Sequence, residues 1–329
     1  MIKKEKDKNI LKIENLSKWF AVNNAWNKRI GWLKALDDVS LSVKKGEIIG
    51  IVGESGCGKS TLGKTIMGIH PLTNGKVTFE GSEVGQLKPS DARQLRRRLQ
   101  YTYQDPGSSL DPRWKIGRSL HEPLEIHTNL SKIERQNKVE EILNAVNLPF
   151  AHLDLYPHEI SGGQQRRIGL ARILTLQPSL VILDEPTSGL DVSVQATILK
   201  LFLNLRKKFD LTYIFISHDL SVVRMFCNKV AVMYLGKIIE INDTKTIFSS
   251  PRHPYTKSLL SAIPQIGGKK ISKSFSLKGE PPDPTNLEDG CRFLNRCQRA
   301  ISICSKEHPD LKTIYKHHKL ACYNPENKS

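Results

Sequence analysis

The stretch Gly53-Glu54-Ser55-Gly56-Cys57-Gly58-Lys59-Ser60 decides the fold of this chain. It fits the pattern G-x-x-x-x-G-K-[ST] and stands between an apolar run at 47–52 and a helical pattern at 59–67. Glycines let successive backbone N–H groups turn toward one point, and the N-terminus of the following helix adds partial positive charge. The stretch therefore predicts a phosphate-binding loop between a buried parallel strand and a helix, in an α/β protein.

Two side chains of this loop have expected ligand roles. Lys59 supplies a full positive charge to the β- and γ-phosphates of a nucleotide, and Ser60 is placed to ligate Mg²⁺. The rest of the predicted nucleotide cradle is formed by Gly53, Ser55, Gly56, Gly58 and Thr61. The alternative, a glycine turn in an unrelated protein, is disfavoured because both a strand and a helix flank the complete motif.

Length and charge limit the possible domain organisation and binding partners of the chain. The 329 residues exceed a usual single domain, so we expect a core of roughly 250 residues and an appendage. The net charge of +17 is compatible with nucleic acid, with an anionic membrane surface or simply with a solvated basic surface. Apolar runs fall short of the roughly 18 residues that span a bilayer, and the start of the chain lacks the apolar core of a signal peptide. We therefore expect the chain in the cytoplasm.

Hydrophobic periodicity outlines further elements. Alternation over 10–52 indicates antiparallel strands before the loop, and a helical subdomain is expected at about 110–175. Within it, Ser131 and Glu134 predict a capping box. The expected later elements are a helix at 191–209 and strands at 211–216, 230–233 and 237–241.

Two carboxylates end the segment 180–185, whose four apolar residues predict a buried strand. Asp184 is suited to hold Mg²⁺ through its water shell, and Glu185 is the candidate general base that polarises the attacking water. The alternative for Glu185 is a solvated acid at a strand end. Downstream, His218 closes another apolar strand and could help to hold that water, although a lone histidine is more often structural. Gln104 could sense magnesium through its amide oxygen.

With Ile160-Ser161-Gly162-Gly163-Gln164 added, the chain resembles the nucleotide-binding subunits of ABC transporters over about residues 10–250. In that family this signature forms a second phosphate cradle at a helix start and acts in trans on the partner's nucleotide. The resemblance implies that two cassettes sandwich two ATP molecules head to tail. Asp191 matches the D-loop of the family. The adenine-stacking aromatic falls at Trp19 or Phe20, with Phe20 favoured by spacing and ordinary core as the alternative for either.

Three stretches carry a second resemblance: 250–260, 279–282 and 104–113. Through them the chain resembles oligopeptide and dipeptide importer ATPases, a group that also serves nickel, glutathione and some sugars, and the part beyond residue 250 resembles the C-terminal extension of that group. We therefore divide the chain into a cassette at 1–250 and an extension at 251–329. The resemblance implies a second ATPase subunit, copy or paralogue, two permeases, a solute-binding protein and a peripheral place on the cytoplasmic face of the membrane.

Four of the six cysteines fall in the extension, with five, six and seventeen residues between successive members: Cys291, Cys297, Cys304 and Cys322. Because a disulfide framework is not expected in the cytoplasm, clustered thiols indicate a metal. Four thiolates serve Zn²⁺ or an iron–sulfur cluster, and free thiols are the third reading. The resemblance implies a [4Fe–4S] cluster.

A rival reading is a soluble cassette protein that acts on ribosomes or DNA. It is disfavoured because the chain has one cassette with 100 residues between Ser60 and Ser161, and no nucleic-acid partner is expected. A regulatory module without hydrolysis is opposed by the presence of both Glu185 and His218. The sequence does not select the cargo.

Overall fold

The structure is a computed structural model that describes residues 9–87, 89–103, 110–262, 279–315 and 317–327. The chain divides into two compact units, one built mainly from Gln86–Ile214 and the other from Leu11–Val43, Glu47–Gly85 and Phe215–Ser329. In the part of the chain that is described, no helix has the length and apolar character needed to cross a membrane.

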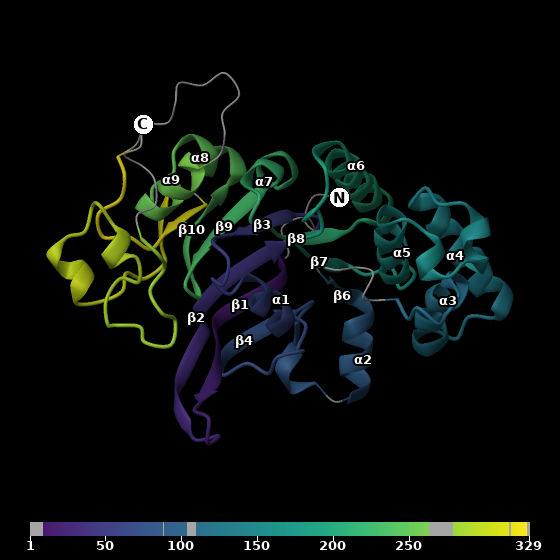
Figure 1. Cartoon of the computed structure of the whole chain (residues 1–329), viewed down its shortest axis with the longest axis horizontal. Helices are drawn as coiled ribbons and strands as arrows, with labels where there is room; N and C mark the ends of the chain where they lie inside the picture. The colour runs from purple at the N-terminus through teal and green to yellow at the C-terminus, as the bar shows by residue number, and fades with distance from the viewer. Residues whose placement is uncertain (1–8, 88, 104–109, 263–278, 316, 328–329) are drawn as a thin grey trace, which may run out of the picture. The chain divides into compact units, whose positions relative to one another are not determined.

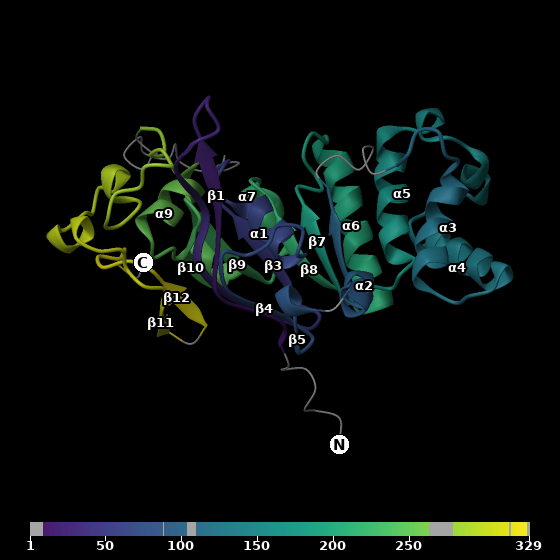
Figure 2. The same ribbon diagram turned by 90° about the horizontal axis from the view of Figure 1, so that it is seen from below.

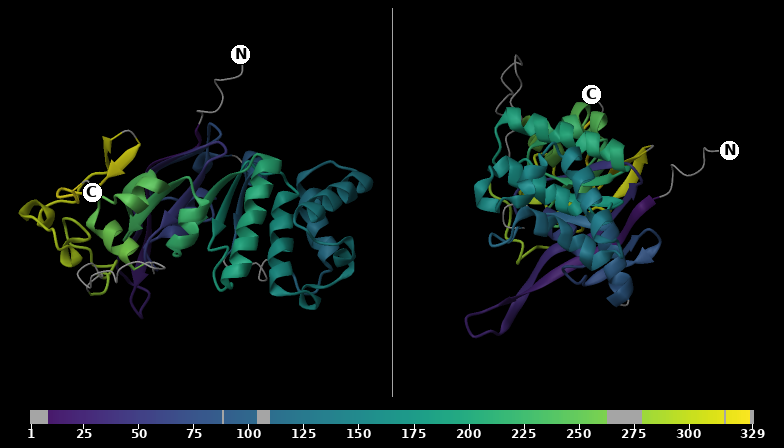
Figure 3. Two further views of the ribbon diagram at one scale, coloured as in Figure 1. Left: turned by 90° about the horizontal axis from the view of Figure 1, so that it is seen from above. Right: turned by 90° about the vertical axis from the view of Figure 1, so that its right-hand side faces the viewer.

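The first unit is dominated by helices. Strand β6 (Leu99–Thr102) pairs in parallel with β7 (Leu180–Asp184), and every residue of β7 is buried. The helices are α2 (Pro89–Arg98), α3 (Ile116–His127), α4 (Lys132–Ala145), α5 (Gly162–Leu174) and α6 (Val192–Phe209), with short 3-10 turns at Phe150–Asp154 and Pro157–Glu159. Helices α3, α4 and α5 contact one another, as the teal segment of Figure 3 shows.

Local sequence explains why these helices begin where they do. The predicted capping box at the start of α4 is confirmed: Ser131 Oγ accepts from the Glu134 N–H, and the Glu134 carboxylate accepts from the Ser131 N–H. This arrangement satisfies two backbone donors that a helix start leaves unpaired. The buried face of α4 is formed by Val139, Ile142 and Leu143.

The second unit contains two β-structures. Four strands lie in the order β2-β1-β4-β5: β1 (Asn9–Asn23), β2 (Arg29–Lys44), β4 (Asn74–Phe79) and β5 (Ser82–Glu83). Five more lie in the order β11-β12-β10-β9-β3: β3 (Ile48–Val52), β9 (Lys229–Tyr234), β10 (Lys237–Asp243), β11 (Lys312–Tyr315) and β12 (His318–Leu320). Strand β3 is parallel to β9, and β10 is antiparallel to both β9 and β12.

Short helices accompany these strands. They are the 3-10 turn η1 (Val84–Gln86), α1 (Lys59–Ile66), α7 (Leu220–Phe226), α8 (Thr244–Ser249) and α9 (Pro254–Ser261), with 3-10 turns η6 (Leu294–Arg296) and η7 (Ser302–Ser305) in the extension. Figure 1 shows α8 and α9 near β10, and Figure 2 shows the β11–β12 hairpin that pairs with β10. The boundary between the two units, between Ile214 and Phe215, falls within strand β8 (Thr212–Ile216). The predicted α/β class with antiparallel and helical parts is confirmed.

One buried carboxylate joins the extension to the sheet of the second unit. Glu240 on β10 is fully buried. Its carboxylate accepts hydrogen bonds from the backbone N–H groups of Arg252 and His253, and it also bonds His318 Nε2 on β12 at 2.8 Å. Burial alone would raise the pKa of Glu240, but these hydrogen bonds outweigh it and lower the pKa. The extension is therefore attached by satisfied polar contacts as well as by the β10–β12 pairing.

Candidate functional site

The predicted phosphate loop joins β3 to α1 in the second unit. Its backbone admits only glycine at two positions. A Cβ at Gly53 (φ +155°) would lie 2.3 Å from the Met233 carbonyl oxygen, and one at Gly58 (φ +104°) would lie 2.3 Å from the Ala35 carbonyl oxygen. Gly58 is also the N-cap of α1 and provides no side-chain cap. The loop thus folds as a close-packed turn against neighbouring backbone, with the positive end of α1 at its end.

Lys59 lies inside this turn. Its side chain is buried, and its Nζ donates to the carbonyl oxygens of Gly53 and Glu54, each at 2.8 Å. Burial raises the pKa of the neighbouring Cys57 thiol, an effect that the Lys59 charge partly offsets. The loop therefore holds one buried ammonium charge beside a neutral thiol.

The other loop residues surround this charge. Ser55 is exposed, whereas Ser60 and Thr61 are partly buried at the start of α1. The Leu62 N–H donates to the Gly58 carbonyl oxygen at 2.9 Å, which closes the first turn of the helix, and Thr65 Oγ1 donates to the Thr61 carbonyl oxygen at 2.7 Å. Gly56 has φ +77° and open space around the position of a Cβ.

The two candidate adenine-stacking aromatics lie on β1, and both are partly buried. Phe20 meets His70 edge-on with ring centroids 5.3 Å apart, and Lys18 Nζ lies 4.7 Å from its ring centroid. Trp19 instead packs 6.4 Å from Trp32. These contacts do not choose between the two rings.

Asp184 and Glu185 lie in the first unit. Asp184 ends β7, is 4% exposed and accepts a hydrogen bond from the Tyr101 hydroxyl. Burial and this bond raise the pKa of Tyr101, so the phenol stays a donor. Glu185 follows with φ +47°, a left-handed backbone that is uncommon for residues other than glycine. Sequence reasoning missed Tyr101, whose only signal is its place on β6, the strand that pairs with β7.

The signature stretch forms the start of α5, also in the first unit. Ser161 is the N-cap: its Oγ accepts from the Gln164 N–H at 3.3 Å, and its own N–H donates to Gln164 Oε1 at 2.8 Å. Ser161 and Gly162 are exposed and Gly163 is partly exposed. Arg166 donates to the carbonyl oxygens of Pro186 and Ser188, at 3.3 Å and 2.9 Å. The signature helix is thereby bonded to the turn that follows Glu185.

Three further residues were predicted to belong to the nucleotide site. Asp191 is exposed and is the N-cap residue of α6. His218 is exposed, follows β8 and belongs with the phosphate loop to the second unit. Gln104 lies outside the described residues. The structure therefore places Lys59 and His218 in one unit, and Asp184, Glu185 and Ser161 in the other.

The four cysteines of the extension line one pocket, which we call the thiol pocket. Burial raises the pKa of Cys291 to about 11 and that of Cys322 to about 12, and it also raises the pKa of Cys297. Among the described residues, no group of three or more His, Cys, Asp or Glu side chains is spaced to hold a metal ion. The donor types are those of a thiolate metal site, but the structure does not group the four thiols as one.

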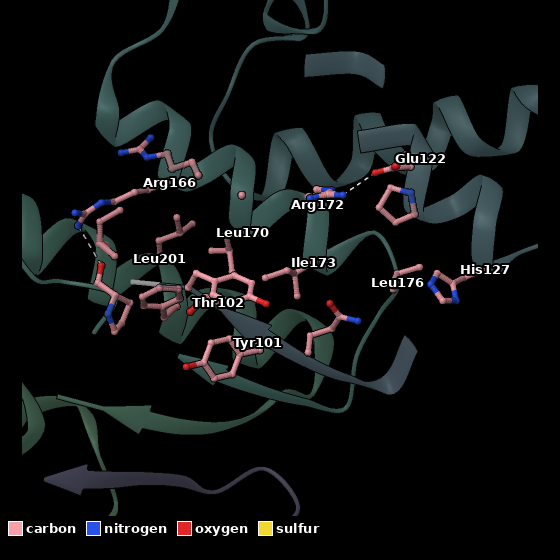
Figure 4. Close-up of a pocket in the computed structure, with 18 of the residues that line it drawn as sticks. Tyr101, Thr102, Glu122, His127, Arg166, Leu170, Arg172, Ile173, Leu176 and Leu201 are labelled. Carbon is pink, nitrogen blue, oxygen red and sulfur yellow. Dashed lines mark hydrogen bonds and ion pairs between the residues drawn. The ribbon is translucent and has the colours of Figure 1, made fainter. Parts of the chain in front are cut away.

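A larger cavity, of about 350 Å³, lies in the first unit (Figure 4). Apolar residues such as Leu170, Ile173 and Leu201 line much of it, and Arg172 pairs with Glu122 at its side at 2.6 Å. None of the described residues predicted to bind nucleotide lines this cavity. Its lining does not include the glycine-rich loop at 53–60, so this cavity differs from the predicted phosphate site.

Comparison with known proteins gives one family. The family model "ABC transporter" matches residues 36–188, and "Oligopeptide/dipeptide transporter, C-terminal region" matches residues 239–304. The oligopeptide transport ATP-binding protein AppF of Bacillus subtilis is 44% identical over 95% of this chain and 97% of its own length. The di/tripeptide transport ATP-binding protein DppF of Pseudomonas aeruginosa is 41% identical over 96% of this chain and 98% of its own length.

Solved structures agree. CbiO1 from Clostridium perfringens, part of the ABC transporter complex cbiONQ, has a TM-score of 0.63 and 28% identity over 74% of this chain and 91% of its own. The ATP-binding cassette MJ0796, in a dimeric post-hydrolysis state bound to ADP and phosphate, has a TM-score of 0.63 and 26% identity over 71% of this chain and 98% of its own. The chain therefore belongs to the ABC transporter family, among the ATP-binding proteins with the C-terminal region of oligopeptide/dipeptide transporters.

Proposed function

We propose that this chain is the ATP-hydrolysing subunit of an importer that takes up oligopeptides or dipeptides through partner permeases. One observation carries the proposal: a complete phosphate loop and a peptide-transporter extension occur in one chain, and both match family models. Relatives named for oligopeptide and for di/tripeptide transport support the cargo class over nickel or glutathione. An importer subunit of this kind works at the cytoplasmic face of the membrane.

In the proposed reaction, Lys59 and the N-terminal end of α1 hold the β- and γ-phosphates of ATP. Ser60, Asp184 and Gln104 would hold Mg²⁺, which neutralises charge on the phosphate oxygens. The Tyr101 hydroxyl supports this role because its hydrogen bond fixes the Asp184 carboxylate. Glu185 takes the proton of the attacking water, and His218 helps to orient that water.

The second half of each site comes from a partner subunit. Ser161, Gly162 and Gly163 stand at the exposed start of α5, where backbone N–H groups can bind the γ-phosphate of a nucleotide on the partner. Gln164 holds Ser161 in position, and Asp191 lines the same interface. We infer a head-to-tail dimer with a copy or a paralogue, two permeases and a solute-binding protein that delivers the peptide.

We also infer that the four cysteines hold a metal centre, a [4Fe–4S] cluster in preference to Zn²⁺. The shared thiol pocket supports this inference, since four thiolates are the ligand set for either metal. Bound metal would join three parts of the extension that are too small for an apolar core of their own.

ATP binding by the purified full chain tests the proposal directly, with Lys59→Ala as the variant. Loss of the buried ammonium should weaken ATP affinity at least about tenfold, since hydrogen bonds to charged groups contribute about 1.5–3 kcal/mol. Lys64→Ala, on the same helix but outside the loop, is the control and should bind ATP like the parent chain. Equal ATP affinity of Lys59→Ala and the parent chain would refute the phosphate-loop assignment.

A further inference from the structure

The extension contacts the phosphate loop directly, through the side chain of Glu54. The two guanidinium nitrogens of Arg296 donate to the two carboxylate oxygens of Glu54, at 2.7 Å and 2.9 Å. The Arg296 side chain is only 4% exposed and that of Glu54 is 24% exposed. A bidentate pair of this kind is directional and stronger than a single surface ion pair.

Glu54 is held at its backbone as well. The Tyr255 hydroxyl, on α9, accepts from the Glu54 N–H at 2.9 Å, while the Glu54 carbonyl oxygen accepts from Lys59 Nζ at 2.8 Å. Tyr255 is fully buried and packs against Tyr234 and Phe293, with ring centroids 4.6 Å and 5.5 Å away. One loop residue therefore lies between the extension on one side and the phosphate-binding lysine on the other.

A second path runs through the turn between β9 and β10. Arg292 donates to the Leu235 carbonyl oxygen and to the Asp37 carboxylate. Gly236, which follows Leu235, donates its N–H to the Cys57 carbonyl oxygen at 2.9 Å. Arg292 follows Cys291 in sequence. The segment 291–297 thus contributes two cysteines to the lining of the thiol pocket. Its Arg296 bonds the phosphate loop, and its Arg292 bonds the turn between β9 and β10.

The charge of Glu54 explains why such a contact matters. A carboxylate within a loop that binds a polyphosphate repels the ligand, and the repulsion is strong where the site is partly buried. The guanidinium group of Arg296 forms a bidentate ion pair with this carboxylate. Its charge cancels that of Glu54, and its fixed fork holds the side chain away from other rotamers.

We propose that Arg296 is a positioning residue for ATP binding: the extension neutralises and fixes Glu54, so that the phosphate loop is ready to accept the nucleotide. The proposal rests on the proposed function, since it assumes that the loop binds ATP. Arg296 acts through Glu54 and does not itself touch the phosphates.

The experiment measures the ATP dissociation constant and steady-state kinetics of the full chain. Arg296→Ala should weaken ATP binding about tenfold, equivalent to about 1.4 kcal/mol. The loss should appear in KM, with kcat at saturating ATP within about threefold, because Glu185 is unaltered. Arg296→Lys keeps the charge without the fork and should recover to within about threefold of the parent chain.

Two further variants separate this role from general damage to the extension. Arg299→Ala removes an arginine of the same segment whose contacts are to Asn324 and Pro325, and it should leave ATP affinity unchanged. Glu54→Gln removes the carboxylate and should bind ATP at least as tightly as the parent chain, although it loses an ion pair. The double variant Glu54→Gln/Arg296→Ala should therefore regain most of the lost affinity.

The outcomes are distinct. If the parent chain binds no ATP, the proposed function fails. If the parent chain binds ATP but Arg296→Ala binds it equally well, or Arg299→Ala is as impaired as Arg296→Ala, the positioning role fails alone. Weaker binding by Glu54→Gln would also overturn it, and this single variant decides the matter should Arg296→Ala not fold.

Discussion

At the scale of single residues, the backbone around Glu185 is the most unusual feature of the candidate catalytic centre. Glu185 follows five buried strand residues and has φ +47°. A left-handed residue after a strand costs energy unless its surroundings hold it, and such residues are often found at active sites. Here the turn after Glu185 is held by Arg166, which bonds the carbonyl oxygens of Pro186 and Ser188.

Glu185→Gln should leave ATP binding intact and lower ATP turnover at least about a hundredfold, since general-base catalysis contributes about 10²–10⁴-fold. The amide keeps the shape of the side chain and loses the base. A steady-state ATPase assay together with a binding measurement checks this. Glu141→Gln, which removes an exposed partner of Lys138, is the control and should turn over like the parent chain. Turnover of Glu185→Gln within a few-fold of the parent chain would remove the base role.

At the scale of elements, two helices of the first unit start with the same device. Ser131 caps α4 with Glu134, and Ser161 caps α5 with Gln164. Each arrangement contributes about 1 kcal/mol to its helix. The two helices differ in their first turn, because α5 begins with two glycines and α4 with Lys132 and Ile133. Glycines leave the backbone N–H groups open to a ligand.

Ser161→Arg should therefore retain ATP in its own phosphate loop but fail to dimerise on ATP when placed in a Glu185→Gln background. The bulky side chain blocks approach of the partner's γ-phosphate. Size-exclusion chromatography with and without ATP measures the effect. Ser131→Arg removes an equivalent cap elsewhere and should dimerise like its parent, which separates the loss of a cap from the loss of the cradle. ATP-dependent dimerisation of Ser161→Arg would show that the cradle does not act in trans.

At the scale of the whole molecule, the extension is integrated with the cassette rather than appended to it. Glu240 accepts hydrogen bonds from His253, the N-cap residue of α9, and from His318 on β12. Arg296 and Tyr255 contact the phosphate loop. Truncating one partner of a buried, hydrogen-bonded charge typically costs about 3–5 kcal/mol. His253 and Phe293 line the thiol pocket, and they also take part in these contacts, since His253 bonds Glu240 and Phe293 packs against Tyr255.

Anaerobically purified protein should contain about four irons per chain, be brown and absorb broadly near 400 nm, as expected for a [4Fe–4S] cluster held by four thiolates. Replacing Cys291, Cys297, Cys304 or Cys322 by Ser should lower iron content and make the extension more sensitive to proteolysis. Cys227→Ser, at a buried cysteine outside the thiol pocket, is the control and should retain the iron. Elemental analysis that finds one zinc and no iron, or no metal, would overturn the cluster.

Features that rest on a local pattern of residues could be predicted from the sequence. The phosphate loop, the buried strand before Asp184, the Ser131 helix cap and the class of the extension are each written in contiguous residues, whose spacing dictates backbone geometry. Pairs of residues that are far apart along the chain could be found only in the folded structure. Tyr101 and Asp184 are 83 positions apart, and Glu54 and Arg296 are 242 apart. No local periodicity encodes such pairs, because they depend on which distant segments the folded sheet brings together.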